Sequence, residues 1–257
     1  MKIRCFSVCM VALCAASLAH GGELAALRTS TQILVVTTQD WDGVAGTLQM
    51  YERPQARKKW KAAGDPIPVV VGKKGLGWGA GVASAREAGR RGADGPIKQE
   101  GDGKSPAGIF RLSTAFGYAA QGPAAWKMPY LSLTPSVECV DDARSKFYTR
   151  VLDRASVVPD WNSSEQMLRP DGEYRWGVVV DHNTDPVTAG AGSCIFLHIW
   201  LGPGVGTTGC TAMSQEQLEG LLARLDPARR PLLVQLPRPE YKKLRRHWKL
   251  PSLPRNP

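Results

Sequence analysis

The segment 190–213 constrains the fold most, because it joins an apolar run, a glycine-rich loop and a short second run that contains cysteine. Residues 194–200 alternate as a β-strand does, so their odd-numbered positions would face the core and leave His198 on the opposite face. The Gly- and Pro-rich residues 201–206 cannot continue a strand and should loop back. Cys210, twelve positions after His198, would then return to the neighbourhood of the histidine.

A helix is predicted directly after this segment. Residues 214–225 carry leucines at helical spacing, and Ser214 with Gln217 three residues later forms a capping-box pattern. Cys210 would then lie near the unpaired N–H groups of a helix N-terminus, which favours a thiolate. A thiolate, a histidine that handles its proton and N–H groups for an oxyanion are the components of acyl transfer. The alternative is a buried, inert cysteine next to a core histidine.

Two blocks of the sequence resemble the catalytic domain of the L,D-transpeptidase (YkuD-like) family. The first is Ile-Phe-Leu-His-Ile-Trp at 195–200 with Thr-Thr-Gly-Cys-Thr-Ala-Met at 207–213, similar to the family's histidine followed by a Ser/Thr-His-Gly-Cys turn. The second, within residues 100–112, contains Ser-Pro-Ala-Gly-Ile-Phe and looks like the family's Thr/Ser-Pro-x-Gly-x-Phe segment. Thr208 stands where the family signature has histidine, and the loop before it is shorter than usual. The resemblance covers most of the chain and implies a mainly β fold with a few helices, a β-sandwich or barrel.

Carried over residue by residue, the resemblance implies that Cys210 is the nucleophile and His198 its base. The amides around Gly209 and Cys210 would bind the oxyanion, and the carbonyl of Ile199 would orient the histidine ring. No metal or diffusible cofactor is implied. We further assign substrate contacts to four residues: Thr208, Trp200, Ser105 and His182.

His182 has two other interpretations. It could be a hydrogen-bonded structural histidine, which is the commoner situation for a histidine at the end of an apolar strand. It could also join His198 and a cysteine in a zinc site, although this set lacks the usual ligand spacing and would consume the nucleophile.

The function implied by the resemblance is peptidoglycan L,D-transpeptidation, in which a cysteine thioester forms on tetrapeptide stems during cell-wall cross-linking or remodelling. With water as the acceptor, the same Cys–His site would make the protein an L,D-carboxypeptidase or endopeptidase. A third possibility is a non-catalytic module that binds the cell wall. A reactive thiol of low pKa would indicate an enzyme, and an inert one a binding module.

The N-terminus reads as a secretory signal peptide over residues 1–19. A basic start (residues 1–4) precedes an apolar run (5–18), and Ser-Leu-Ala at 17–19 fits cleavage before His20. A retained membrane anchor is the alternative, but the apolar run is short for a bilayer span. We therefore expect an exported protein of the periplasm or cell envelope, with no stable membrane span after cleavage and one catalytic domain over 20–257 that ends in a basic tail.

The cysteine count predicts one disulfide. Three cysteines lie beyond the signal, and this odd number suggests one disulfide and one free thiol. If Cys210 is the nucleophile, Cys139 and Cys194 are the natural pair, with two isolated buried thiols as the alternative.

The net charge is +10 for the whole chain and falls to +8 without Lys2 and Arg4 of the signal. Such a chain suits an anionic partner such as an acidic wall polymer. No nucleic-acid-binding module is recognisable, so we expect peptidoglycan stems and no nucleic acid as partners, and a monomer. The basic runs at 53–61 and 242–246 read as solvated faces.

The remaining pattern is that of a β-rich chain. Glycine-rich residues 72–95 and Gly-Lys-Ser at 103–105 do not meet the context of nucleotide-binding loops. Residues 129–142 read as a polar loop, residues 161–167 as a short helix, and the chain beyond 236 as a basic, proline-rich tail that is poorly packed at its end. Strands are predicted by runs of β-branched and apolar residues at 33–37, 46–51, 69–71, 108–112, 174–180 and 231–236.

Overall fold

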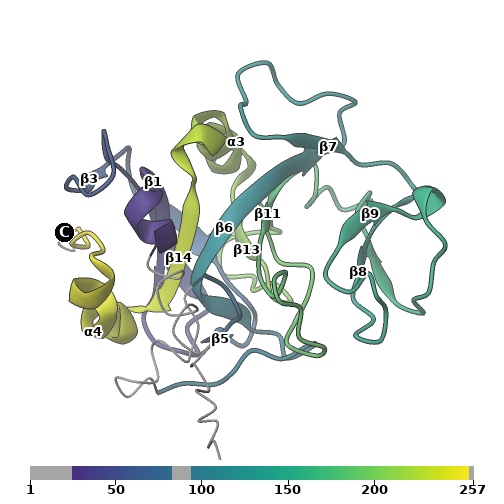
Figure 1. Ribbon diagram of the computed structural model, residues 1–257, viewed down its shortest axis with the longest axis horizontal. Coiled ribbons are helices and arrows are strands. Elements are labelled where there is room, and N and C mark those ends of the chain that lie inside the picture. Colours follow the sequence, from purple (N-terminus) through teal and green to yellow (C-terminus); the bar gives the residue numbers. More distant parts are fainter. Residues whose placement is uncertain (1–24, 83–93, 255–257) are drawn as a thin grey trace, which may run out of the picture.

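Strand pairing closes the main sheet of this chain into a β-barrel (Figure 1). The computed structural model describes residues 25–82 and 94–254, so the predicted signal peptide lies outside the described residues. Around the barrel the order is β1 (Gln32–Thr38), β14 (Leu232–Pro237), β6 (Ser105–Gly117), β11 (Trp176–Val180), β12 (Phe196–Ile199), β13 (Thr211–Met213), β4 (Ile67–Val70) and β2 (Ala45–Glu52). The barrel closes because β2 pairs antiparallel with β1, Gln32 opposite Glu52 and Thr38 opposite Gly46.

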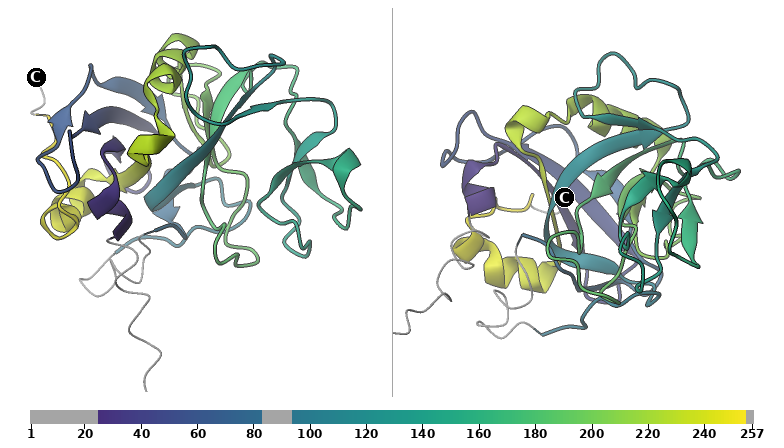
Figure 2. Two further views of the ribbon diagram at one scale, coloured as in Figure 1. Left: turned by 45° about the horizontal axis from the view of Figure 1, so that its top comes forward. Right: turned by 45° about the vertical axis from the view of Figure 1, so that its right-hand side comes forward.

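Short elements extend or cover this barrel. The helix α3 (Gln215–Arg224) contacts β11 and β12, and α4 (Arg238–Trp248) contacts β14 and β1. Figure 2 shows α4 on one side of the barrel and the helical residues 25–29 close to it. The shorter pieces are β3 (Lys61–Ala62), β5 (Leu76–Trp78), β7 (Tyr130–Ser132) and the 3-10 turns η1 (Arg154–Ser156) and η2 (Pro227–Arg229).

A small second sheet lies beside the barrel. Its central strand β8 (Val137–Val140) pairs with β9 (Val151–Asp153) and with β10 (Ser164–Gln166), and Figure 1 shows β8 and β9 to the right of the barrel. A disulfide between Cys139 on β8 and Cys194 before β12 joins the two sheets. The predicted cysteine pairing is therefore confirmed, with Cys210 as the free thiol among the described cysteines.

The second sheet corrects two predictions. Residues 161–167 contain the strand β10 and not a helix, and the expected loop 129–142 contains β7 and β8. The physical reason is Glu138, a buried carboxylate on β8 that accepts hydrogen bonds from the side chains of Trp161 (3.0 Å), Ser164 (2.7 Å) and Gln166 (3.1 Å). These polar partners make the segment look like a surface loop, whereas they are gathered around one buried charge.

The predicted strands are confirmed in β1, β2, β4, β6, β11 and β14. The helix after the cysteine motif is also confirmed, since Ser214 caps α3 by accepting from the Gln217 N–H. The first part of the chain beyond 236 is well packed, whereas its last residues, 255–257, lie outside the described residues. This first part forms α4, in which Tyr241, Leu244 and Trp248 recur at helical spacing and are buried.

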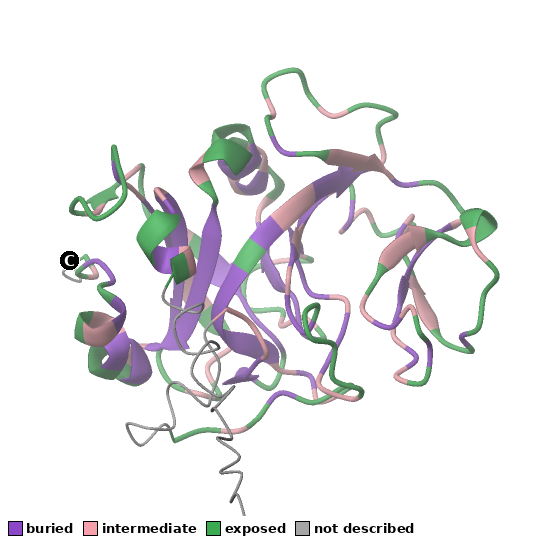
Figure 3. Ribbon diagram, viewed as in Figure 1, coloured by how far each residue is buried: buried purple, intermediate pink, exposed green. Residues whose placement is uncertain are grey.

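Burial separates two hydrophobic clusters. The larger one fills the barrel and includes the fully buried strands β1 and β14, which are purple in Figure 3. The smaller one contains residues of the barrel wall and of the second sheet: Phe116, Leu133, Val137, Cys139, Met167, Tyr174, Phe196 and Cys210. Cys210 thus lies between the barrel and the second sheet. Across residues 25–82 and 94–254, helices long and apolar enough to cross a bilayer are absent.

Candidate active site

Hydroxyl groups fix the backbone of the cysteine turn. Thr207 Oγ1 accepts from the N–H of Gly209 (3.1 Å) and donates to the carbonyl of Cys210 (2.6 Å). Ser105, the first residue of β6, donates to the same carbonyl (2.8 Å) and accepts from the Gly72 N–H (2.8 Å). The two blocks that carry the family resemblance therefore meet at the Cys210 carbonyl.

The Cys210 thiol is buried. Its Sγ accepts from the N–H of Phe196 (3.3 Å) and donates to the carbonyl of Cys194 (3.5 Å). Burial raises the pKa of the thiol well above its ordinary value, and the nearby carboxylate of Glu165 adds to the rise. The resting group is a neutral thiol.

The expectation of a thiolate stabilised by a helix N-terminus is wrong. The three residues of β13 separate Cys210 from Ser214, the N-cap of α3. At about 3.3 Å per residue, the four steps from Cys210 to Ser214 place the helix N-terminus about 13 Å away, beyond the reach of its dipole.

His198 lies on β12, and its ring is oriented by the backbone. Nδ1 lies 2.7 Å from the carbonyl oxygen of Ile199, as the resemblance implied. Because a carbonyl only accepts, Nδ1 carries the proton and Nε2 is left with a lone pair in the neutral ring. Burial lowers the pKa of His198 to about 4, so the ring is neutral at pH 7. Parallel pairing of β12 with β13 sets His198 opposite Ala212, two residues beyond Cys210.

Tyr174 connects the cysteine and the histidine, and the sequence pattern did not single it out. Its ring lies edge-on to that of His198, with centroids 5.1 Å apart. Its hydroxyl donates to Glu165 Oε1 (2.6 Å), and its hydrogen bonding also lowers the pKa of Cys210, by less than burial raises it. No sequence motif marks Tyr174. It lies two residues before β11, and β11 pairs with β12, the strand that carries His198.

A cleft of about 330 Å³ opens over the cysteine turn. Its lining includes Thr208 and Gly209 of the cysteine turn, and it contains more acidic than basic residues. Burial raises the pKa of the Glu165 carboxyl, and one Asp141 oxygen is buried without a hydrogen-bond partner among the described residues. The lining residues are Lys98, Glu100, Gly101, Asp141, Glu165, Ser193, Cys194, Ile195, Thr208 and Gly209.

An ion pair and hydrogen bonds hold the charged groups of this cleft in place. The Lys98 ammonium donates to Asp102 Oδ1 (2.7 Å) and to the carbonyl of Gln99 (2.6 Å). Glu100 Oε2 accepts from Ser193 Oγ (2.7 Å) and from the Tyr148 hydroxyl (2.5 Å). Lys98 and Glu100 are therefore already paired, and Glu165 is ion-paired with Arg169 (3.2 Å), which leaves Asp141 as the lining carboxylate that has an oxygen without a hydrogen-bond partner among the described residues.

The residues assigned to substrate contact occupy different places. Thr208 is exposed and lines the cleft. Trp200 is half-buried and lies outside the lining, and its backbone N–H donates to the Met213 carbonyl. Ser105 lies inside the protein, where it holds the cysteine turn.

His182 also lies inside. It is 2% exposed, Nε2 lies 3.0 Å from the Ala191 carbonyl oxygen, and its ring packs edge-on against Phe110. This environment is that of a structural histidine and not of a group that touches substrate. In the part of the chain that the structure describes, no three His, Cys, Asp or Glu side chains cluster as metal ligands would.

Comparisons with known proteins give structural neighbours only. Neither a family model nor a curated protein matches the chain. Among solved structures, it is similar to the helical cell shape determining protein Pgp2 from Campylobacter jejuni, with 13% identity, a TM-score of 0.39 and coverage of 83% of this chain and 53% of that one. It is also similar to Bd1075 of Bdellovibrio bacteriovorus, with 13% identity, a TM-score of 0.38 and coverage of 86% and 55%. The chain spans about half the length of these structures.

Proposed function

We propose that this protein is a peptidoglycan L,D-transpeptidase that acts through a thioester on Cys210. The observation that carries the proposal is that a free thiol, Cys210, and a histidine whose Nδ1 is tied to the Ile199 carbonyl lie on or next to the paired strands β12 and β13, with His198 opposite Ala212. The resemblance of the two sequence blocks supports it, as does the hydrogen bond of Ser105 to the Cys210 carbonyl that joins these blocks. Under this proposal, the protein acts in the periplasm or cell envelope.

The proposed chemistry begins from two neutral groups. His198 Nε2 takes the proton of Cys210, and Sγ attacks the carbonyl carbon of a tetrapeptide stem that follows an L-centre of a diamino acid. The oxyanion is bound by the N–H of Cys210 and by that of Gly209, which exchanges its contact with Thr207 Oγ1. The C–N bond breaks as the imidazolium protonates the departing D-alanine amine. An amine of a second stem then attacks the thioester, loses its proton through His198 and returns the thiol.

Burial of both partners suits a proton transfer that occurs only after substrate is bound. A raised thiol pKa and a lowered histidine pKa disfavour the ion pair in the free protein. A bound acyl group that excludes water and supplies a developing oxyanion changes this balance. The Asp141 oxygen in the cleft lining, which has no hydrogen-bond partner among the described residues, fits a substrate that carries a free ammonium group, as a diamino acid does.

The test is incubation of the protein with purified tetrapeptide-stem muropeptides, followed by mass spectrometry of the products. The proposal expects cross-linked dimers and released D-alanine, with turnover lost in Cys210→Ala and retained in Arg150→Gln, an exposed position outside the cleft lining. Shortened stems without dimers would replace the transferase with the hydrolase that uses the same residues. Product formation by Cys210→Ala would exclude a cysteine mechanism.

A second candidate is a non-catalytic module that binds the cell wall. The specific observation in its favour is the raised pKa of a thiol that already has two hydrogen-bond partners, because such cysteines are usually inert. Sacculus pull-down separates the candidates. Binding to sacculi without any turnover of muropeptides supports the module, and turnover supports the enzyme.

A further inference from the structure

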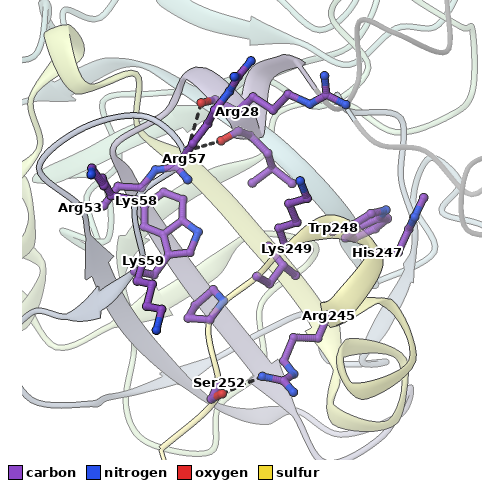
Figure 4. Close-up of a pocket in the computed structure, with 14 residues that line it drawn as sticks. Arg28, Arg53, Arg57, Lys58, Lys59, Arg245, His247, Trp248, Lys249 and Ser252 are labelled. Atoms are coloured by element: carbon purple, nitrogen blue, oxygen red, sulfur yellow. Dashed lines mark hydrogen bonds between the residues drawn. The ribbon is translucent and has the colours of Figure 1, made fainter.

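A strongly basic hollow lies between α4 and the turn that follows β2, away from the cleft over Cys210. It has a volume of about 670 Å³ and shares no lining residue with that cleft. Figure 4 shows cationic side chains reaching it from three separate segments of the chain. They are Arg28 from the helical residues 25–29, Arg57, Lys58 and Lys59 from the turn after β2, and Arg245 and Lys249 from the end of α4 and the residue after it.

Packing brings these segments together. The buried guanidinium of Arg53 donates from Nη2 to the carbonyls of Leu27 (2.6 Å) and Ser30 (2.6 Å), and it stacks 4.0 Å from the ring of Trp60. Arg53 therefore clamps the turn after β2 to the helical residues 25–29. On the other side, Trp248 buries its ring and fixes the end of α4, so the neighbouring cations face the hollow from a rigid frame.

Within the described residues, carboxylates do not balance the charges of the hollow. Among residues 25–82 and 94–254, the six cations just named form no ion pair, and no carboxylate belongs to the lining. Like charges held this close repel one another, and the folded chain keeps them together without compensation. Their solvation limits the cost, because the Lys side chains are exposed.

The polar groups of the hollow are nearly all donors. Guanidinium and ammonium groups only donate, and Arg245 already donates to Ser252 Oγ (2.6 Å). A ligand that complements such a lining must bring several acceptor oxygens and more than one negative charge.

We propose that this hollow binds a compact multivalent oxyanion, a molecule or chain segment with two or more phosphate or carboxylate groups. Its volume is in the range of sites for small ligands, roughly 300–1,000 Å³. Among the described lining residues, aromatic surface for stacking bases is limited, since Arg53 covers one face of Trp60 and Trp248 is buried, which argues against single-stranded nucleic acid. The proposal is independent of the chemistry proposed for Cys210.

The test is calorimetric titration of the protein with tripolyphosphate and with tricarballylate at constant ionic strength. The variant Lys58→Glu/Lys249→Glu should weaken binding of the preferred probe about tenfold or more, because two contacts become repulsions. The matched variant Arg150→Glu/Arg175→Glu makes the same change in net charge at exposed positions outside the hollow and should leave the affinity unchanged. The more tightly bound of the two probes identifies phosphate or carboxylate as the recognised group.

Other outcomes would overturn the proposal. Equal losses in both double variants would reduce the effect to general charge attraction. Failure of both probes to bind at millimolar concentration would mean that the hollow is not a site for them. Tighter binding of a single-stranded DNA oligomer, or of vesicles that contain phosphatidylglycerol, than of either probe would assign the surface to a macromolecule or a membrane.

Discussion

The cleft over Cys210 and the basic hollow beside α4 are built in opposite ways. Cys210 and His198, the proposed reactive groups beneath the cleft, come from one short segment; they are buried, neutral and hydrogen-bonded, and neither belongs to the cleft lining. The cations of the hollow come from three distant segments, and they are charged and unpaired within the described residues. A local motif was therefore readable in the sequence, whereas a surface assembled by the fold was not.

The difference also separates how each region responds to its environment. In the cleft, low solvent access shifts the pKa of His198 and Cys210 towards their neutral forms. In the hollow, exposure keeps the charges solvated, so salt will screen them strongly. Changes to the cleft should therefore alter chemistry and stability by large amounts, and changes to the hollow should alter binding with little effect on the fold.

The largest effect is expected from His198→Asn. This change removes the Nε2 lone pair that takes the thiol proton, and it keeps a side chain that can donate to the Ile199 carbonyl. We expect kcat to fall by about 10³-fold or more with muropeptide substrates, in line with the loss of a general base. Steady-state kinetics measure this, and the circular dichroism spectrum should be unchanged. A loss below about tenfold would remove His198 from the mechanism.

Opening the disulfide beside the cleft should destabilise the protein strongly. Cys139 and Cys194 are 55 residues apart, and the chain-entropy estimate for such a loop is about 4 kcal/mol. Urea unfolding of Cys139→Ser/Cys194→Ser should show a loss of about 2–4 kcal/mol in the free energy of unfolding. Turnover should fall as well, because the Cys194 carbonyl accepts from Sγ of Cys210. Unchanged stability would mean that the two sheets are held together without this bond.

Acid should destabilise the protein through its buried histidines. Burial lowers the pKa of both His182 and His198 from 6.5 to about 4, so the unfolded chain binds more protons between these values. The free energy of unfolding should therefore fall as pH drops from about 6.5 towards 4, by on the order of 3 kcal/mol for each histidine. Urea midpoints measured from pH 7 to pH 4 test this. The curve of His182→Gln should be flatter than that of the natural chain, and parallel curves would contradict the assignment.

The smallest effect is expected in the basic hollow. Lys58→Glu/Lys249→Glu removes repulsion between solvated cations, so stability at low salt should rise by at most about 1 kcal/mol. The gain should vanish in 1 M salt, where the Debye length is about 3 Å. Thermal unfolding at both salt concentrations measures this difference. A loss of stability at low salt would show that these lysines support the fold, and the contrast with the cleft would fail.

The barrel was largely predictable because its strands are buried on both faces and read as continuous apolar runs. β1 and β14 are examples, and α3 was marked by its Ser214 cap and leucine spacing. The second sheet was missed because Glu138 draws polar side chains around itself, and a polar run reads as a loop.

In the site, the pairing of Cys210 with His198 was readable as a motif, but its electrostatics were not. The raised pKa of the thiol depends on burial by the second sheet and on Glu165, neither of which is near Cys210 in sequence. Tyr174 carries no motif and gains its position only from strand pairing. The basic runs read as solvated faces because the packing of α4 against the barrel, which brings them together, is a long-range contact.

Whether Cys210 forms a thioester is the most direct test of the account. The protein is mixed with tetrapeptide-stem muropeptide, quenched in acid within its first turnover and measured by intact-protein mass spectrometry with peptide mapping. The account predicts an added mass equal to the stem minus D-alanine, located on Cys210 and absent from Cys210→Ala. In a His198→Asn variant that has been loaded with the thioester, this added mass should decay slowly. An unmodified Cys210 in a sample that releases D-alanine would contradict it.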